Sequence, residues 1–275
     1  MAKGISLHIG LNSVDPNHYD GWKGDLLACE ADAQDMEMIA AKEGFGERIL
    51  LLTQDAKFDR VVKELERIGK SLEPGDLFML TYSGHGGQVP DLNRDEDDLQ
   101  DETWCLYDRQ LVDDHIYKLL GGFREGVRII LLSDSCHSGT VARDALRGIT
   151  PTAERDGRSR AMPPDVANRV YRKNIKMYIS TAIDEKFENV VGAVKASVIL
   201  ISGCQDNQRS YDGTFNGLFT GTLLQVWHAG RFHGSYRSLH QQVLRRMPSD
   251  QSPNFFTVGA PNLAFEQQRP FSILT

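Results

Sequence analysis

Short runs of β-branched residues and leucine alternate with longer segments of helical period along most of this 275-residue chain. Such alternation is typical of parallel strands that are joined by crossover helices. The strand candidates are Ile5–Leu11, Arg48–Thr53, Asp76–Tyr82, Val127–Ser133, Ile175–Thr181 and Ala196–Ser202. The pattern therefore predicts an α/β fold in which a mostly parallel, six-stranded sheet is sandwiched between helices.

Five segments carry the helical period, and some begin after a residue that commonly caps helices, such as Asp55 or Ser235. The predicted helices are Leu26–Glu43, Ala56–Lys70, Asp113–Leu120, Leu218–Ala229 and Ser235–Met247. Most of them are long enough to cover one face of the sheet.

Two stretches interrupt this rhythm. Asp91–Glu102 holds seven carboxylates and one arginine, and we interpret it as a loop. Residues 145–173 contain three prolines and many arginines without clear periodicity, which is typical of a flexible connection. We therefore expect a single domain, 1–275, with a large block at 1–144, a basic linker at 145–173 and a small block at 174–275.

Composition narrows the function classes. A net charge of -7 and a pI near 5.6 argue against a nucleic-acid binder, which would normally carry a basic face. The sequence has no apolar run of about 18 residues and no leader-like start, so we expect a cytoplasmic protein without a membrane partner. Its four scattered cysteines are expected to be reduced thiols rather than a disulfide framework or a zinc site.

Two glycine-rich motifs follow predicted strands: Ser-Gly-His85-Gly86-Gly and Asp-Ser-Cys136-His-Ser-Gly. Ligands bind at the carboxyl edge of open parallel sheets, so neighbouring strands would bring the histidine to face the cysteine. The imidazole could then accept the thiol proton and later protonate a leaving amine. The N–H groups of Gly86 and Cys136 could form an oxyanion hole, and we predict Cys136, His85 and Gly86 as catalytic residues.

Two alternatives compete with this interpretation. An isolated cysteine is more often a small buried apolar residue, and a histidine in a turn is more often a hydrogen-bonded structural group. The pair of glycine-rich motifs favours catalysis instead. His137 is a rival base, although side chains of adjacent residues tend to diverge and it lacks a glycine platform.

The chain resembles the caspase-like peptidases, most closely the bacterial metacaspases. The resemblance rests on the two motifs, 51 residues apart from His85 to Cys136, on Cys29-Glu-Ala-Asp32-Ala, on the acidic stretch, and on Ile-Ser-Gly-Cys204-Gln-Asp206-Asn-Gln. It covers nearly the whole chain. It implies a caspase-hemoglobinase fold, an acyl-enzyme mechanism, and cleavage of polypeptides after arginine or lysine.

The resemblance also implies an acidic substrate pocket. Its walls would be Cys29, Asp32, Ser83 and Asp134, and Asp206 is a further candidate. Two carboxylates suit a guanidinium, which offers a planar fork of donors. The alternative is that Asp32 caps a helix and Asp134 closes a turn. A peptidase of this specificity could also cut its own arginine-rich linker, although that linker could equally be a solvated basic loop.

A metal site is the last candidate. Asp91, Asn93, Asp95 and Glu102 have EF-hand spacing, but Glu96 occupies the position that requires glycine, so an EF-hand is rejected. The resemblance implies calcium ligands at Asp101, Asp113, Asp114 and Asp144; a solvated run of charge remains the alternative. No organic cofactor is expected.

Two other functions stay open for the sequence. One is a caspase-fold interaction module without proteolysis, which the intact His85 and Cys136 disfavour. The other is a thiol hydrolase or transferase that acts on non-peptide substrates, which the acidic pocket would distinguish by its preference for cationic side chains. The resemblance favours a monomer, and dimerisation of the caspase type would need a free sheet edge, such as a last strand near Asn254–Val258.

Overall fold

The computed structural model describes residues 2–90, 100–136, 159–185, 191–204 and 210–274. A six-stranded sheet forms its centre, in the order β2-β1-β3-β7-β8-β9. The first five of these strands are parallel and only β9 is antiparallel to its neighbour. Their bounds are β1 Gly4–Gly10, β2 Glu47–Leu52, β3 Leu77–Ser83, β7 Arg128–Asp134, β8 Ser197–Ser202 and β9 Asn254–Gly259. The predicted α/β fold with a mostly parallel six-stranded sheet is confirmed.

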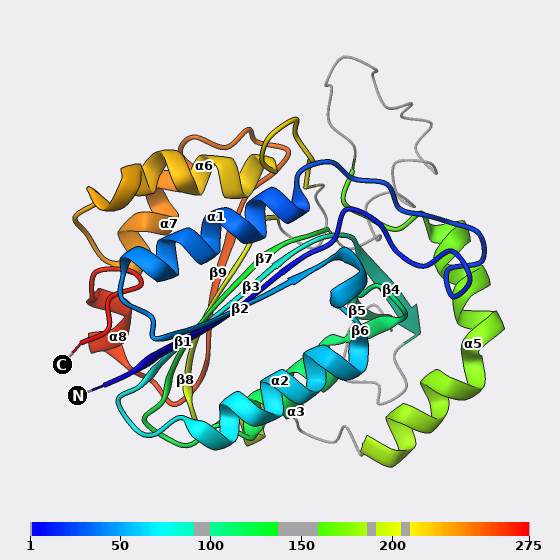
Figure 1. Ribbon diagram of the computed structural model, residues 1–275, viewed down its shortest axis with the longest axis horizontal. Helices are drawn as coiled ribbons and strands as arrows, with labels where there is room; N and C mark the ends of the chain where they lie inside the picture. Colours follow the sequence, from blue (N-terminus) through cyan, green and yellow to red (C-terminus); the bar gives the residue numbers. More distant parts are fainter. Residues whose placement is uncertain (1, 91–99, 137–158, 186–190, 205–209, 275) are drawn as a thin grey trace.

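Helices cover both faces of the sheet (Figure 1). On one face lie α1 Cys29–Lys42, α6 Leu218–Trp227, α7 Tyr236–Leu244 and the short α8 Leu263–Gln267. On the other face lie α2 Phe58–Ser71 and α3 Asp113–Gly121. Single 3₁₀ turns occupy Thr53–Asp55, Val191–Ala193 and His228–Gly230. All five predicted helices are present, and Ser235 caps α7 by accepting a hydrogen bond from the Ser238 N–H.

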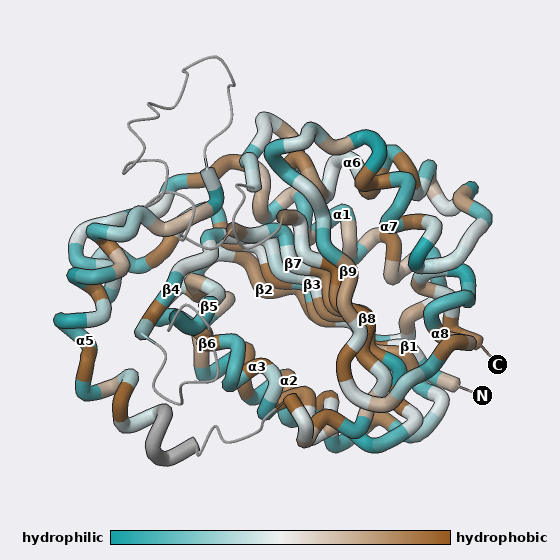
Figure 2. The backbone as a smooth tube through the Cα atoms, turned by 180° about the vertical axis from the view of Figure 1, so that it is seen from behind, coloured by the Kyte–Doolittle hydropathy of each residue, from teal (hydrophilic) through white to brown (hydrophobic). Residues whose placement is uncertain are grey.

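Two apolar clusters hold these layers together, one on each face of the sheet. Figure 2 shows the strands of the large sheet as mainly hydrophobic, while the covering helices alternate in character. This pattern follows from burial, because parallel strands with both faces covered read as continuous apolar runs. The sheet is therefore a rigid support for the loops at its carboxyl edge.

One predicted strand is wrong. Ile175–Thr181 belongs to the helix α5, Pro164–Glu185, and the sixth strand of the sheet is β9. Val166, Val170 and Tyr178 are buried at multiples of four residues, while Ile175 and Ile179 are exposed, which fits a helix with one packed face. The expected flexible connection also ends earlier than predicted, because α5 begins at Pro164. The first part of that linker lies outside the described residues.

A second, three-stranded antiparallel sheet lies beside the first and was not predicted. It consists of β4 Gly86–Pro90, β5 Gln100–Cys105 and β6 Gln110–Val112. The end of the acidic stretch, Asp101 and Glu102, therefore lies in β5 rather than in a loop. Residues 91–99 lie outside the described part of the chain.

Across the described residues, no helix combines the length and the apolar character that spanning a bilayer requires. All four cysteines are free and buried.

Candidate active site

His85 and Cys136 follow neighbouring strands. β3 ends at Ser83 and β7 ends at Asp134, and these two residues are directly paired in the register of the sheet. The histidine and the cysteine each lie two residues beyond that pair, so the sheet brings both to one edge. Both side chains are buried, at 5% and 0% exposure.

A backbone carbonyl orients the imidazole. The His85 Nε2 lies 3.1 Å from the carbonyl oxygen of Gly24. Burial lowers the pKa of His85 to about 4, against the opposing effect of this hydrogen bond, so the ring is neutral at pH 7. A neutral ring that donates from Nε2 keeps Nδ1 as a lone-pair acceptor, and Nδ1 is buried without a hydrogen-bond partner among the described residues. The geometry therefore leaves Nδ1 free to act as a base.

Gly24 adopts a φ of +55°, and a Cβ there would lie 3.0 Å from both His85 Cδ2 and the Trp22 ring. The loop can approach the imidazole this closely because the residue has no side chain. Sequence reasoning found no acidic group to orient His85, and it missed this carbonyl, because a backbone oxygen leaves no residue signature.

The chain itself fills the cleft between these groups. Arg160 is fully buried, and its carbonyl oxygen accepts hydrogen bonds from the N–H of Gly86 at 2.9 Å and of Cys136 at 3.3 Å. These are the two donors that the sequence predicts for an oxyanion hole. The Cys136 thiol lies nearby, where it accepts a short hydrogen bond from the Ser210 N–H.

Residues on both sides of Arg160 are also bound in the cleft. Ser159 pairs with Tyr211, and Ala161 pairs with Gly86. The Arg160 N–H donates to the Ser210 carbonyl at 3.0 Å, and the Met162 N–H donates to the Gly86 carbonyl at 2.7 Å. The segment 159–162 therefore lies in the cleft as an added strand, which is how extended peptides commonly bind.

The Arg160 guanidinium enters a pocket of three carboxylates. Nη2 contacts Asp32 at 2.7 Å and Asp212 at 2.8 Å, and Nη1 contacts Asp134 at 3.0 Å. Nη1 also donates to the Ser83 hydroxyl at 2.8 Å. The predicted wall residues Asp32, Ser83 and Asp134 thus meet around one cation.

Asp212 is the residue that sequence reasoning missed, and the predicted Asp206 lies outside the described residues. Two backbone N–H groups, of Leu27 and Ala28, hold the Asp212 carboxylate. No local motif distinguishes it from other aspartates, so only the folded chain identifies it. The remaining predicted wall residue, Cys29, is buried at the start of α1, and burial raises the pKa of its thiol to about 12. It therefore contributes a neutral surface.

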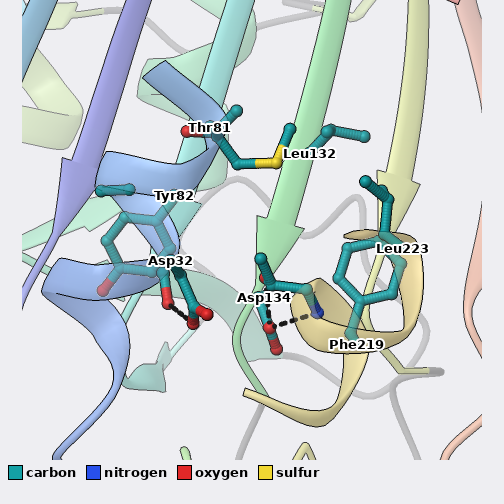
Figure 3. Close-up of a pocket in the computed structure, with 11 residues that line it drawn as sticks. Asp32, Thr81, Tyr82, Leu132, Asp134, Phe219 and Leu223 are labelled. Atoms are coloured by element: carbon teal, nitrogen blue, oxygen red, sulfur yellow. Dashed lines mark hydrogen bonds between the residues drawn. The ribbon is translucent and has the colours of Figure 1, made fainter. Parts of the chain in front are cut away.

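Neighbouring groups fix the carboxylates in place. Asp32 accepts hydrogen bonds from the Gly217 N–H and from Asn216, and Asp134 accepts from Ser210 and Thr220. Figure 3 shows Asp32 and Asp134 at the same end of the sheet, with Phe219 and Leu223 of α6 beside them. A cavity of about 10 Å³ adjoins these groups, which is room for one water molecule at most.

Burial and the neighbouring charges shift the pKa values of the ionisable groups in this pocket. Burial raises the pKa of Asp32, and the neighbouring Asp134 adds to that effect while Arg160 opposes it. The pKa of Arg160 is raised well above its usual value, because Asp134, Cys29, Asp32 and Asp212 outweigh the opposing effect of burial. Three carboxylates at such a site need a cation between them.

The predicted metal ligands lie elsewhere. Asp101 is in β5, while Asp113 and Asp114 begin α3; Asp144 lies outside the described residues. Burial, together with the charges of Glu102, Asp101 and Asp114, raises the pKa of Asp113 well above its usual value. Among the described residues, no three His, Cys, Asp or Glu side chains are grouped so as to hold a metal ion. The described residues therefore do not form a complete calcium site by themselves.

Comparisons with known proteins agree on one family. A model of the caspase domain matches residues 14–269. Metacaspase-1A of Aspergillus clavatus is 31% identical over 255 residues, which cover 81% of this chain and 57% of the fungal protein. Metacaspase-1 of Saccharomyces cerevisiae is 28% identical over 250 residues, covering 79% of this chain and 56% of the yeast protein. The chain thus spans a little under three fifths of the length of these relatives.

A solved structure is similar over the whole chain. The crystal structure of a Geobacter sulfurreducens protein is 54% identical and superimposes with a TM-score of 0.90. The similarity covers 99% of this chain and 100% of that one.

Proposed function

The chain belongs to the caspase-domain family, and from this premise we propose that it is a cysteine endopeptidase that cuts polypeptides after arginine. The observation that carries the proposal is the way in which Arg160 is bound. Its side chain fills the acidic pocket, and its carbonyl oxygen accepts hydrogen bonds from the N–H groups of Gly86 and Cys136. A peptide bond held in this way is arranged as a substrate.

The proposed reaction uses the groups in contact with that bond. The Cys136 sulfur attacks the arginine carbonyl carbon, and His85 Nδ1 accepts the thiol proton. The Gly86 and Cys136 N–H groups stabilise the oxyanion that forms. His85 then gives its proton to the leaving amine, which leaves an acyl-enzyme, and water releases the new carboxylate.

The pocket supports arginine over lysine as the preferred residue. The two Nη atoms of Arg160 make contacts with four different side chains, in directions that a planar fork satisfies. A lysine has one nitrogen and would leave at least one buried carboxylate without a direct partner. We therefore expect lysine substrates to be cut more slowly.

The same binding of Arg160 supports self-cleavage, and we assign the cut to the Arg160–Ala161 bond. In the uncut chain, Arg160 occupies the pocket that a substrate needs. Cleavage is thus also the route by which the pocket becomes open to other polypeptides.

Matched fluorogenic peptides that end in Arg, Lys or Asp test the substrate class. We expect kcat/KM to fall in the order Arg, Lys, Asp, with Asp below detection because it would add a fourth carboxylate to the pocket. The readout is the initial rate at equal peptide concentration. Faster cleavage after Asp than after Arg would contradict the pocket, and no cleavage of any peptide by the cut protein would contradict the peptidase.

Gly217 should limit the size of the group that the pocket accepts. A Cβ at this position would lie 2.5–2.6 Å from Nη2, Cζ and Nη1 of Arg160. Overpacking of this kind costs about 1–3 kcal/mol, so Gly217→Ala should lower kcat/KM for Arg peptides by about 5- to 160-fold. Lys peptides, which present a single nitrogen, should lose less.

The matched control is Gly121→Ala at the end of α3, where the nearest atom to the added Cβ would be 3.6 Å away. It should leave both rates unchanged. Equal losses for Arg and Lys peptides in Gly217→Ala would contradict a role for Gly217 in selecting the guanidinium.

Calcium dependence remains a proposal for the acidic residues around Asp113. Its support is the resemblance, which implies ligands at Asp101, Asp113 and Asp114. Burial and the charges of neighbouring carboxylates raise the pKa of Asp113, and a bound hard cation would offset those charges. Running the peptide assay with calcium and with a chelator tests it, and equal rates would remove it. A monomeric, cytoplasmic protein is likewise proposed; the four free cysteines support a reducing compartment.

A further inference from the structure

Ala161 carries the amine that is released when the Arg160–Ala161 bond is cut, yet its contacts hold it at the site. Ala161 is 6% exposed and packs with Cys136 and Cys204. Met162 is fully buried, and its N–H donates to the Gly86 carbonyl at 2.7 Å. None of these contacts needs the bond between Arg160 and Ala161, so they persist when that bond is cut.

A stiff connection joins this segment to a helix. Met162 is followed by Pro163 and by Pro164, the first residue of α5, and the Ala167 N–H already donates to the Pro163 carbonyl at 2.9 Å. Proline fixes φ near −65°, and it suits the first position of a helix. The position of Ala161 is therefore tied closely to the position of α5.

The helix is itself anchored to the body of the protein. Figure 1 shows α5 beside the β4-β5-β6 sheet and the loop that follows β1. The contact is a buried apolar cluster of Met162, Val166, Ala167 and Val170 with Val14, Tyr19 and Cys105. A buried hydrogen bond from Gln110 to the Tyr178 hydroxyl, 2.9 Å long, adds to it. An ion pair between Arg169 and Asp20 is exposed and contributes little.

We propose that the self-cleaved protein is also a peptide ligase, which joins acyl groups ending in arginine to its own Ala161 amine. This inference rests on the proposed peptidase activity. An arginine ester or peptide first acylates Cys136 and releases its alcohol or amine. The retained Ala161 nitrogen then attacks the thioester carbonyl carbon, a new C–N bond forms as the C–S bond breaks, and the amine proton passes through His85 to the departing thiolate.

Proximity decides the competition between this amine and water. Well-oriented intramolecular reactions reach effective molarities of about 10⁵–10⁸ M, far above the concentration of water. The amine must be neutral to attack, and an ordinary α-amino group has a pKa of about 7.7–8.0. Ligation should therefore prevail at pH 8, and it should fall about tenfold for each pH unit well below that pKa.

The test uses the self-cleaved full-length protein and an excess of a labelled peptide methyl ester that ends in arginine, because the new Arg160 carboxylate competes for the pocket. The mass of the fragment 161–275 is measured, together with the amount of free peptide acid. We expect that fragment to gain the mass of the acyl peptide on Ala161, with more adduct than free acid at pH 8. Protein alkylated at Cys136 should show no adduct.

Two variants test whether the Ala161 amine must be held in position in order to react. Met162→Leu keeps the apolar contact and should keep the ratio of adduct to acid. Met162→Asp removes the anchor and should lower that ratio at least tenfold, while hydrolysis of the ester continues.

Each other outcome has a distinct meaning. Free acid without adduct at pH 8 would overturn the ligase and leave the peptidase intact. Neither acid nor adduct would overturn the peptidase. An equal ratio in both Met162 variants would overturn the positioned amine. A protein that never yields the fragment 161–275 would overturn ligation and self-cleavage together. Ester hydrolysis by the uncut Arg160→Gln chain, whose pocket is not filled by its own arginine, would still identify the peptidase.

Discussion

A Cys136→Ala chain is expected to remain uncut between Arg160 and Ala161 and to lose at least about 10⁴-fold in peptide hydrolysis. The reason is that the Cys136 sulfur is the proposed nucleophile for the Arg160 carbonyl, which accepts hydrogen bonds from the Gly86 and Cys136 N–H groups. Those N–H groups remain in the variant, so the arginine should still bind. Gel analysis of the purified chain and the rate with an Arg peptide are the two measurements.

Cys204→Ala provides a matched control for this prediction. Cys204 is also a free, buried cysteine at this edge of the sheet, 2% exposed, and its sulfur donates to the Ser135 carbonyl at 3.3 Å. Its replacement should leave self-cleavage and peptide hydrolysis within a few-fold of the original. Normal cleavage by Cys136→Ala would remove that residue as the nucleophile.

Replacing Arg160 by glutamine should have the second large effect, at least about 10³-fold on cutting after position 160. Glutamine is neutral and cannot pair with Asp32, Asp134 and Asp212 at once. Arg160→Lys keeps the positive charge and should be cut slowly rather than not at all. The uncut Arg160→Gln chain should nevertheless hydrolyse added Arg peptides, because its pocket is no longer filled by its own arginine.

Stability should change in the same variant. Removing one partner of a buried ion pair costs about 3–5 kcal/mol in the free energy of unfolding, less where water can enter the emptied pocket. Burial raises the pKa of Asp32, so protonation relieves this cost: the loss should be small below the unfolded pKa of about 3.9 and should grow as the pH rises through the folded pKa.

Chemical denaturation at pH 4 and pH 7 measures that difference, with Arg160→Lys as the comparison. A glutamine variant that is as stable as the original at pH 7 would show that the cation does not hold the pocket together. Continued cutting at position 160 in that variant would contradict the pocket as the determinant of the cut site.

The sheet could be predicted well because its strands are buried on both faces and read as unbroken apolar runs. Ile175–Thr181 shows where that signal fails: a short run that contains two isoleucines fits a buried strand and a helix equally well. Its packing against the loop after β1, through Tyr178 and His18, decides the matter, and no local pattern contains that contact.

The candidate site divides in the same way. His85, Cys136 and Asp134 could be found because motifs at strand ends carry them, and Asp32 could be found because the family resemblance includes the start of α1. The Gly24 carbonyl, Asp212 and the wall at Gly217 could not be found, because each acts through its position in space rather than through a local pattern. Arg160 was one of several arginines in a linker until the fold placed it between three carboxylates.

The order in which the pocket is built from the sequence has a consequence for biosynthesis. Asp32, Ser83, Asp134 and Arg160 are translated first, whereas Asp212 and Gly217 follow, as does β8, the neighbour of β7 in the sheet. At roughly 5–20 residues per second, the ribosome needs about 3–11 seconds to pass from Arg160 to Gly217. A nascent chain therefore carries the proposed nucleophile and the proposed cut site before it can assemble the pocket that binds Arg160. We expect self-cleavage to wait until the small block has emerged and folded.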